Sequence, residues 1–498
     1  MTNKKINTSV LISIVLVLCF GNKSIASQRQ DMTEQMKDSL VYLSISTGGY
    51  RIREPWNQKN LSNDWACGCA VGDNEVITTA EVVTNLVYVK ILKYGQNSFI
   101  NAKVKVVDYQ KNLCLIEIDP NQLSKPLKPL TFSQDYQKGM SVDAYWLSSD
   151  RRIYSKRGYL DRVRVQKSET SFGKNLCYIV SDVSQHTDSG EVYFAGLSPI
   201  GIASWSNSAN EVGLIPAETI IQFLKAVKDG NYEGFGSVGF AVSDLLDPAL
   251  RSYLKMPESL DYGVYVSDVY TLGTGSESLK TGDVLLKIDD NVIDPYGLFE
   301  HPKYGKLQFD NLITDKNAGR PIKFEVWRDG KTEEIQSSVK NFKESDMLVP
   351  YNEYDRQPEY IVVAGFVFQK LTREYLQEFG SDIAGSSPSN LYYYYLESAF
   401  KPTDKRRDIV VLSFVLPTKY TVGYAQLGQL IVSKYNGMEI SSIEDILDAQ
   451  KLNPESPFDV IEFEMDSPTV VIARDQIQAA DAMIIANYGV RKLDNLNK

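Results

Sequence analysis

Histidine is the side chain that most often acts as a general base at neutral pH, and this chain contains two. His186 lies three residues before Ser189, so one short stretch holds a hydroxyl nucleophile candidate and a base that could activate it. His301 lies much further along the chain. A solvated histidine on the same loop as the serine is the alternative interpretation, and we favour it.

Cysteine is the second residue type with chemistry of its own. Cys67 and Cys69 flank Gly68 in an expected strand, which points both to one face without bringing their Cβ atoms within easy disulfide reach. Cys114 and Cys177 complete the set that follows residue 26. Free buried thiols and a disulfide both remain open. With two histidines in the chain a Cys/His zinc site is disfavoured, so we expect no metal and no cofactor.

Composition limits the classes of function. A chain of 498 residues with 43% hydrophobic and 23% charged residues is typical of a folded protein of about three domains. Its formal net charge is −10 and its basic residues form no long run. Such a chain lacks the positive surface that neutralises a phosphate backbone, so we expect no nucleic-acid partner.

The first residues have the organisation of a secretory signal peptide. Lys4 and Lys5 precede an apolar run at 10–20, and Ser24-Ile25-Ala26 offers small residues to a signal peptidase. The run is roughly half the length needed to span a bilayer. We therefore expect residues 1–26 to be removed on export to the periplasm, and peripheral association with the outer membrane is left open.

The rest of the chain reads as β-rich units joined by short connections. Short β-branched runs broken by turn residues from about 41 to 203 predict a barrel or sandwich. Apolar residues at helical spacing predict a helix over 217–228, between Pro216 and Gly230. A glycine-rich linker follows, and then two further units.

The last two units share a short repeat. Residues 282–290 and 428–437 have the same glycine, apolar run and turn, so the units at about 237–339 and 360–488 are predicted to be related. A run of tyrosines at 392–395 is interpreted as a packed or interface helix, because its rings would spread around a helix axis.

A series of motifs, in their order along the chain, resembles the HtrA/Deg serine proteases, above all the plant-type Deg branch. The motifs are Pro55-Trp56-Asn57-Gln58, Cys67-Gly68-Cys69-Ala70-Val71, Val76 to Val83, Asn112 to Ile116, Thr187-Asp188-Ser189-Gly190, Ile215-Pro216, Gly234-Phe235, Asp247 to Leu254 and Val363 to Phe368. The resemblance implies a mainly β fold, a trypsin-like double β-barrel followed by two PDZ-type α+β domains. The implied segments are a signal peptide at 1–26, a degenerate protease domain at 27–230, and PDZ-type domains at 234–345 and 358–490.

The resemblance also locates the positions of a catalytic triad. The family motif T-x-A-H-x-V is matched by Thr78, Ala80 and Val83, but Glu81 stands where the family has histidine. Asn112 stands where the family has the aspartate that orients that histidine. Such losses cost about 10⁴-fold for the aspartate and about 10⁶-fold for the histidine in well-studied serine proteases. A glutamate, with a reference pKa of about 4.3, is a weak base for a serine at neutral pH.

The nucleophile motif survives only in part. Ser189 holds the nucleophile position, and Thr187 and Asp188 form the loop that would present the oxyanion hole. Thr187 and Glu191 replace glycines of the family motif, and a Cβ restricts the backbone that such a loop needs. In this fold the base approaches from the other barrel, so His186 on the serine's own loop is badly placed to replace it.

The first PDZ-type domain carries a candidate peptide-binding loop. Ser237, Val238, Gly239 and Phe240 stand where HtrA proteins hold a peptide's terminal carboxylate on backbone NH groups. The alternative is that Gly239 only shapes the beginning of a strand. No comparable loop is identifiable ahead of Phe366 in the second domain.

Three hypotheses for the function follow. The favoured one is an exported pseudoprotease that binds unfolded or partner polypeptides in the cell envelope as a chaperone or scaffold. The first alternative is an active serine endoprotease of envelope quality control that uses Ser189. The second alternative is a structural scaffold without a client, and the resemblance implies a homo-oligomer, a trimer or a multiple of it.

Overall fold

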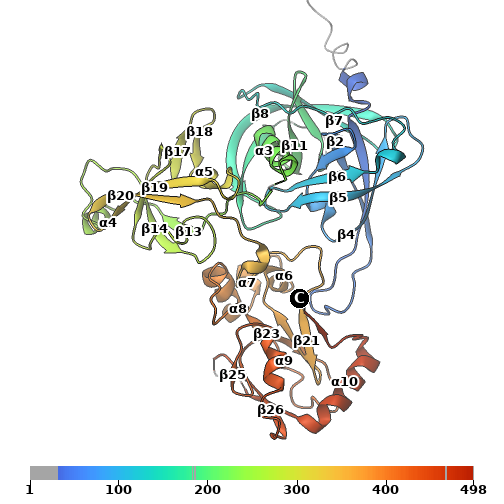
Figure 1. Ribbon diagram of the computed structural model, residues 1–498, viewed down its shortest axis with the longest axis vertical. Coiled ribbons are helices and arrows are strands. Elements are labelled where there is room, and N and C mark those ends of the chain that lie inside the picture. The colour runs from blue at the N-terminus through green and yellow to red at the C-terminus, as the bar shows by residue number, and fades with distance from the viewer. Residues whose placement is uncertain (1–31, 182, 184–186, 231, 466–467, 497–498) are drawn as a thin grey trace, which may run out of the picture.

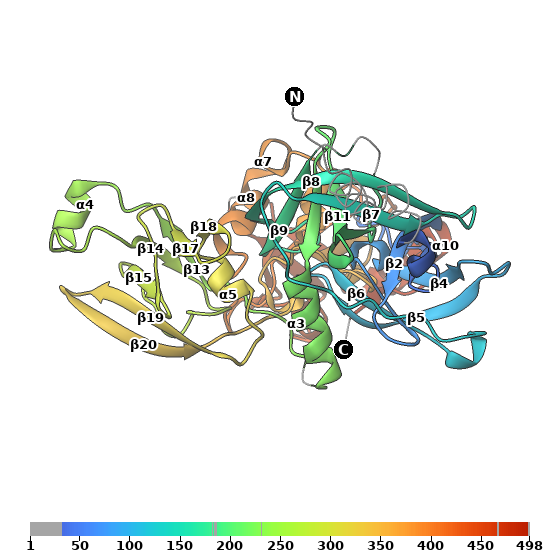
Figure 2. The same cartoon turned by 90° about the horizontal axis from the view of Figure 1, so that it is seen from above.

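The computed structural model describes residues 32–181, 183, 187–230, 232–465 and 468–496, and the predicted signal peptide lies outside them. Two closed β-barrels lie side by side, and two smaller units follow, each built on an open sheet (Figure 1). The view from above shows the third unit beside β8 and β9 of the second barrel (Figure 2). Within these ranges, no helix has both the length and the apolar character needed to cross a membrane.

The first barrel closes in the order β1-β2-β3-β6-β5-β4. Its alternating residues produce the inward face, as in β1, where Val41, Leu43 and Ile45 are buried at every second position. A single 3-10 turn, η1 (Glu81–Val83), connects β3 to β4 and brings residue 81 to the open end of the barrel. The strands are β1 (Leu40–Thr47), β2 (Ser62–Ala70), β3 (Glu75–Thr78), β4 (Leu86–Lys93), β5 (Ile100–Asp108) and β6 (Leu113–Ile118), and η2 (Pro120–Gln122) follows.

The second barrel closes in the order β10-β11-β12-β9-β8-β7. Its strands are β7 (Ser141–Leu147), β8 (Ile153–Lys167), β9 (Lys174–Ser181), β10 (Val192–Ala195), β11 (Ser198–Ser206) and β12 (Val212–Pro216). Helix α3 (Ala217–Lys228) then packs Ile220 and Phe223 into the core shared by the two barrels. The helix predicted over 217–228 is thereby confirmed.

The third unit is a sheet in the order β13-β14-β15-β19-β20, and β16 pairs with β15. Strands β19 (Pro321–Arg328) and β20 (Lys331–Ser338) are joined by a tight hairpin whose central residues, Asp329 and Gly330, both have positive φ. The elements are β13 (Phe240–Ser243), α4 (Pro248–Tyr253), β14 (Val264–Val269), β15 (Val284–Ile288), β16 (Asn291–Val292), β17 (Leu298–His301), β18 (Gly305–Gln308), α5 (Asn311–Thr314), β19 (Pro321–Arg328), β20 (Lys331–Ser338) and η3 (Glu344–Asp346).

The fourth unit is a sheet in the order β27-β26-β24-β23-β22-β21-β28, and β25 pairs with β24. The predicted repeat is confirmed, because β15 and β24 each turn through a positive-φ residue, Asp289 or Asn436, into a short partner strand. Its strands are β21 (Tyr360–Val363), β22 (Phe366–Lys370), β23 (Val410–Val415), β24 (Leu430–Tyr435), β25 (Met438–Glu439), β26 (Phe458–Phe463), β27 (Val470–Ala473) and β28 (Asp494–Asn495). Its helices are α6 (Arg373–Gln377), α7 (Ile383–Ser386), α8 (Ser389–Tyr393), the π-helical turn η4 (Tyr394–Ser398), α9 (Asp445–Gln450) and α10 (Arg474–Tyr488).

Two details of the sequence interpretation are settled here. The tyrosine run is helical, and it packs in part, since Tyr394 donates to Glu464 while Tyr393 stays 58% exposed. The four cysteines are buried free thiols, which is the first of the two interpretations left open.

Candidate active-site cleft

Ser189 and Glu81 meet where the two barrels face each other. Ser189 lies in the turn before β10, and Glu81 begins η1 after β3. The Ser189 Oγ donates a hydrogen bond to the Glu81 Oε1. The serine's backbone carbonyl accepts a bond from the Cys67 amide of β2 (2.9 Å), which fixes the turn against the first barrel. The nucleophile position is therefore hydrogen-bonded to a carboxylate.

Asn112 holds the backbone of Glu81 at the beginning of η1. Its Oδ1 accepts a hydrogen bond from the Glu81 amide (2.9 Å), and its Nδ2 donates to the Ser204 hydroxyl of β11 (3.0 Å). Its φ of 54° lies in the left-handed region, which asparagine tolerates better than most residues. Asn112 thus links both barrels beneath Glu81, but it brings a neutral amide and no charge.

The surroundings of Glu81 raise the pKa of its carboxyl. Burial raises the pKa of the Glu81 carboxyl above its usual range, and the hydrogen bond from Ser189 lowers it in part. The nearby Glu169 raises this pKa further by charge repulsion. A raised pKa makes a carboxylate a somewhat stronger base, yet the pair has no imidazole to carry the proton to a leaving group.

The loop that precedes Ser189 rests on a buried ion pair. Glu191 Oε1 accepts a hydrogen bond from the Asp188 amide (3.1 Å), and Glu191 Oε2 lies 2.5 Å from the Lys156 Nζ. The two side chains are 0% and 3% exposed, and burial raises the pKa of Glu191 to about 7 against the lowering effect of Lys156. The Asp188 amide is therefore directed at the protein interior, and Thr187 is buried beside it.

Gly190 is the one residue of this turn whose identity the backbone dictates. Its φ is +83°, and a Cβ at this position would lie 2.0 Å from the carbonyl oxygen of Cys67. No side chain larger than hydrogen fits there without moving β2. The conformation of the Ser189 turn thus depends on glycine directly after the serine.

An open cleft of about 780 Å³ surrounds this site. Trp65 of β2 and Trp205 of β11 stand on opposite barrels and both line it. The strand β11 pairs with β10 only as far as Ile202, so its last residues, through Ser206, keep one edge toward the cleft within the described strands. Such an edge can accept an extended chain as an added strand.

The histidines do not complete the site among the described residues. His301 lies on β17 of the third unit, where it stacks on Tyr304, and burial lowers its pKa. His186 lies outside the described residues. No histidine is among the described residues that line the cleft.

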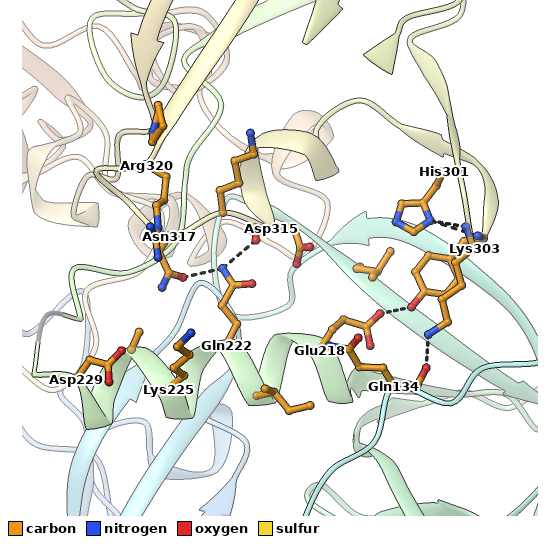
Figure 3. Close-up of a pocket in the computed structure, with 16 residues that line it drawn as sticks. Gln134, Glu218, Gln222, Lys225, Asp229, His301, Lys303, Asp315, Asn317 and Arg320 are labelled. Atoms are coloured by element: carbon orange, nitrogen blue, oxygen red, sulfur yellow. Dashed lines mark hydrogen bonds between the residues drawn. The ribbon is translucent and has the colours of Figure 1, made fainter. Parts of the chain in front are cut away.

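A second pocket, of about 760 Å³, lies between α3 and the third unit (Figure 3). Gln222 of α3 donates to the Asp315 carbonyl (2.9 Å) and to Asn317 Oδ1 (2.8 Å), and Tyr304 donates to Glu218. It shares no lining residue with the cleft at Ser189. These contacts fasten the third unit to the second barrel.

The candidate peptide loop of the third unit is already occupied by its own chain. The Ser237 amide donates to the Lys340 carbonyl and the Gly239 amide to the Thr274 carbonyl, both at 2.9 Å. Ser237 and Phe240 are buried, and Val238 bridges Thr274 in parallel. Two of the expected carboxylate-binding amides thus have internal partners. The arrangement favours the alternative, that Gly239 shapes the beginning of β13.

Sequence reasoning missed several residues of the site. Lys156 lies in the long polar strand β8, and nothing in its neighbours marks it as the partner of Glu191. Ser204 and the two cleft tryptophans come close to Ser189 only through barrel closure. The one available signal was Glu191, a glutamate at a position where a buried residue is expected. A buried carboxylate needs a cation, so its presence could have predicted a partner such as Lys156.

Comparison with known proteins finds a family profile, sequence relatives and solved structures that are similar to this chain. A family profile described as PDZ domain matches residues 349–494, which contain the predicted segment 358–490. The chain is 25% identical over 439 residues to putative protease Do-like 3, mitochondrial, of Arabidopsis thaliana, covering 87% of this chain and 75% of that protein. It is 26% identical over 459 residues to protease Do-like 2, chloroplastic, of the same plant, covering 90% and 73%. A solved HtrA-type protease, AlgW with decapeptide, is 16% identical, with a TM-score of 0.47 and coverage of 63% of this chain and 98% of that one.

These similarities extend over most of the chain, and the relatives carry names of serine or Do-like proteases. The order of two six-stranded barrels and two α+β units, with a PDZ domain at the C-terminal end, agrees with them. The chain is therefore similar to HtrA/Deg proteases over most of its length, fits their plant-type Deg branch, and combines a trypsin-like double β-barrel with PDZ-type domains.

Proposed function

We propose that this chain is a pseudoprotease that binds unfolded or partner polypeptides in the cleft between its barrels. One observation carries the proposal. The cleft is open, but the base position holds Glu81, which is hydrogen-bonded to Ser189 and supported by the neutral Asn112.

The arrangement lacks what peptide hydrolysis needs. A serine protease needs a base that accepts the serine proton and returns it to the leaving amine, and histidine does both near neutral pH. The oxyanion must also be stabilised, and a missing donor costs about 10² to 10³ in rate. Here Thr187 and Glu191 stand where the family motif has glycines, and the loop is fixed from within by the Glu191 carboxylate, which accepts from the Asp188 amide and pairs with Lys156.

The same cleft keeps what polypeptide binding needs. The edge of β11 offers backbone hydrogen bonds to an extended chain, and Trp65 and Trp205 offer apolar faces. Binding of this kind depends on main chain and shape rather than on one sequence, as a chaperone or scaffold requires.

A paired assay tests the proposal. The purified protein is mixed at neutral pH with a chemically unfolded client, and aggregation is followed by light scattering while casein degradation is followed on a gel. We expect suppressed aggregation, undegraded casein, and no change in either result with Ser189→Ala. Absence of both activities would refute the proposal and would favour the structural scaffold without a client.

The hydrogen bond between Ser189 and Glu81 favours a second candidate, a serine endopeptidase with a Ser–Glu pair. Because burial raises the pKa of Glu81, this pair would act where the carboxyl is ionised. A fluorophosphonate probe separates the two functions. Labelling that Ser189→Ala abolishes would support the endopeptidase, and we expect none above background.

Location and assembly belong to the same proposal. The predicted signal peptide supports export to the cell envelope, although the two plant relatives are named mitochondrial and chloroplastic. N-terminal sequencing of envelope protein should find Ser27 first, and a chain that begins at Met1 would oppose export. Multi-angle light scattering should find a trimer or a multiple of it, and a monomer that persists with client would oppose assembly.

A further inference from the structure

The walls of the cleft carry a charge of one sign. Four carboxylates line it, and no lysine, arginine or histidine is among its described lining residues. The four are Asp64, Glu81, Glu169 and Asp188. A cleft with this lining concentrates negative potential, since low-dielectric walls focus the field of the charges around it.

The carboxylates form an inner and an outer pair. Glu81 and Asp188 lie at the Ser189 turn, where Glu81 is hydrogen-bonded to the serine. Asp64 on β2 and Glu169, in the connection after β8, are exposed and come from opposite barrels. Glu169 raises the pKa of the buried Glu81 by repulsion, so the fields of the two pairs overlap. A polypeptide segment bound in the cleft would have Asp64 on one side and Glu169 on the other.

The outer pair of carboxylates is not neutralised by an ion pair. Among the described residues, no lysine or arginine forms an ion pair with Asp64 or Glu169. Arg164 lies against the Trp205 ring, with its guanidinium 5.6 Å from the ring centre, and it donates to Gln166 (2.8 Å). Lys156 lies below the loop in its ion pair with Glu191.

Aromatic faces accompany the carboxylates. Trp65 is 41% exposed and stacks on Tyr42 with 5.9 Å between ring centres. Trp205 lies on the opposite wall. An aromatic face attracts a cation and also packs against the methylene stem of lysine or arginine. The combination of carboxylate and tryptophan at each wall fits a long cationic side chain better than an anionic or a short polar one.

We propose that the cleft selects extended polypeptide segments that carry lysine or arginine. The inference rests on the proposed polypeptide binding and names the class of segment that the site prefers. The edge of β11 would hold the segment's main chain, while Asp64 and Glu169 would hold its cationic side chains above the tryptophans. Acidic segments would be repelled by all four carboxylates.

Matched peptides test the preference on the full chain. Fluorescence anisotropy is measured with labelled peptides of alternating serine and valine that carry two lysines, two glutamines or two glutamates at the centre. All peptides are amidated at the C-terminus, which removes a terminal carboxylate as an anchor for the PDZ-type domains. We expect the lysine peptide to bind about 10-fold more tightly than the glutamine peptide, a gap that narrows as salt rises.

Variants locate the effect. Asp64→Asn with Glu169→Gln should weaken lysine-peptide binding by about 5-fold, the range for two partly exposed ion pairs, and should thereby narrow the gap between the lysine and glutamine peptides. Glu258→Gln with Glu455→Gln is the control, because it removes two exposed carboxylates elsewhere and changes the net charge equally. A carbodiimide should cross-link the peptide's lysines to Asp64 or Glu169.

The possible outcomes distinguish the preference for cationic segments from the proposed polypeptide binding on which it rests. Equal affinity for all three peptides, unchanged in the Asp64 and Glu169 variant, would overturn the cationic preference and leave polypeptide binding intact. A lysine preference lost equally in the control variant would also overturn it, because net charge would then be the cause. Binding of no peptide would refute the proposed function itself.

Discussion

At the scale of single residues, the site is defined by Glu81 and Asn112, which stand where related proteases have histidine and aspartate. Glu81 occupies the base position and reaches Ser189, and Asn112 holds the backbone of Glu81, so the three positions converge as the resemblance implied. The sequence could predict this convergence because the motifs around each position are retained. It could not predict the Lys156–Glu191 pair beneath the loop, because the partners lie on strands that meet only when the barrel closes.

Restoring the triad should not restore activity. Glu81→His with Asn112→Asp replaces the base and its orienting acid, but Thr187 and Glu191 still stand where the family motif has the glycines of the oxyanion loop. We therefore expect the double variant to cleave casein about 10² to 10³ times more slowly than a quadruple variant that also carries Thr187→Gly and Glu191→Gly. Strong cleavage by the double variant alone would show that the oxyanion loop is intact.

The buried Glu191 should give stability a specific dependence on pH. Its folded pKa of about 7 lies above the ordinary value, so the folded state binds more protons between about pH 4.5 and 7. Its ionisation therefore removes stability as pH rises through this window. Glutamine cannot ionise, so the free energy of unfolding of Glu191→Gln should rise relative to that of wild type as pH increases from 4.5 to 7, by up to about 3 kcal/mol. Denaturant titrations at several pH values measure this difference. A difference that stays constant or reverses sign would contradict the assigned pKa.

At the scale of elements, periodicity predicted some parts well and others poorly. The helix at 217–228 appeared as predicted because proline, glycine and the apolar spacing all agreed on it. Strand β8 gave no such signal, since its charged side chains alternate with few large apolar ones, and its pairing with β7 and β9 defines it. The peptide loop at 237–240 matched a motif, but the motif could not predict that two of its amides bond internally to the carbonyls of residues 274 and 340.

The turn that carries Ser189 should tolerate no Cβ at its glycine. Gly190→Ala combines a φ of +83° with a contact at 2.0 Å to the Cys67 carbonyl, so we expect a loss of about 3 kcal/mol in unfolding free energy. Gly196→Ala is the control, because Gly196 also has positive φ but no atom within 4 Å of its Cβ. The control should lose about 1 kcal/mol. Equal losses in thermal or urea unfolding would contradict the packing argument.

At the scale of the whole molecule, the loop between β1 and β2 of the first barrel packs against the fourth unit. Trp56, between β1 and β2, packs against Tyr360 and Phe414 of the fourth unit. Gln369 donates to the Ile52 carbonyl (2.8 Å) and Gln357 to the Pro55 carbonyl (2.7 Å). These contacts make the first barrel and the fourth unit one packed body.

Removing the central ring should loosen this joint. Trp56→Ala deletes the aromatic contacts and should cost about 2 to 3 kcal/mol, less than a fully buried tryptophan because the ring is only half-buried. Calorimetry should then show the fourth unit melting earlier, and limited proteolysis should cut near residues 346–358. Trp65→Ala, at the cleft, should leave that separation unchanged. A single unaltered transition in Trp56→Ala would show that other contacts hold the units together.

The central claim is that the protein holds polypeptides without cutting them, and the intact mass of a bound client tests it most directly. An unfolded client is incubated with the full-length protein at neutral pH, the complex is isolated by size exclusion, and the client is weighed by mass spectrometry over hours. The account predicts a client of unchanged mass that co-elutes with the protein, identically for wild type and Ser189→Ala. Client fragments that accumulate with wild type and disappear with Ser189→Ala would contradict it and establish a protease.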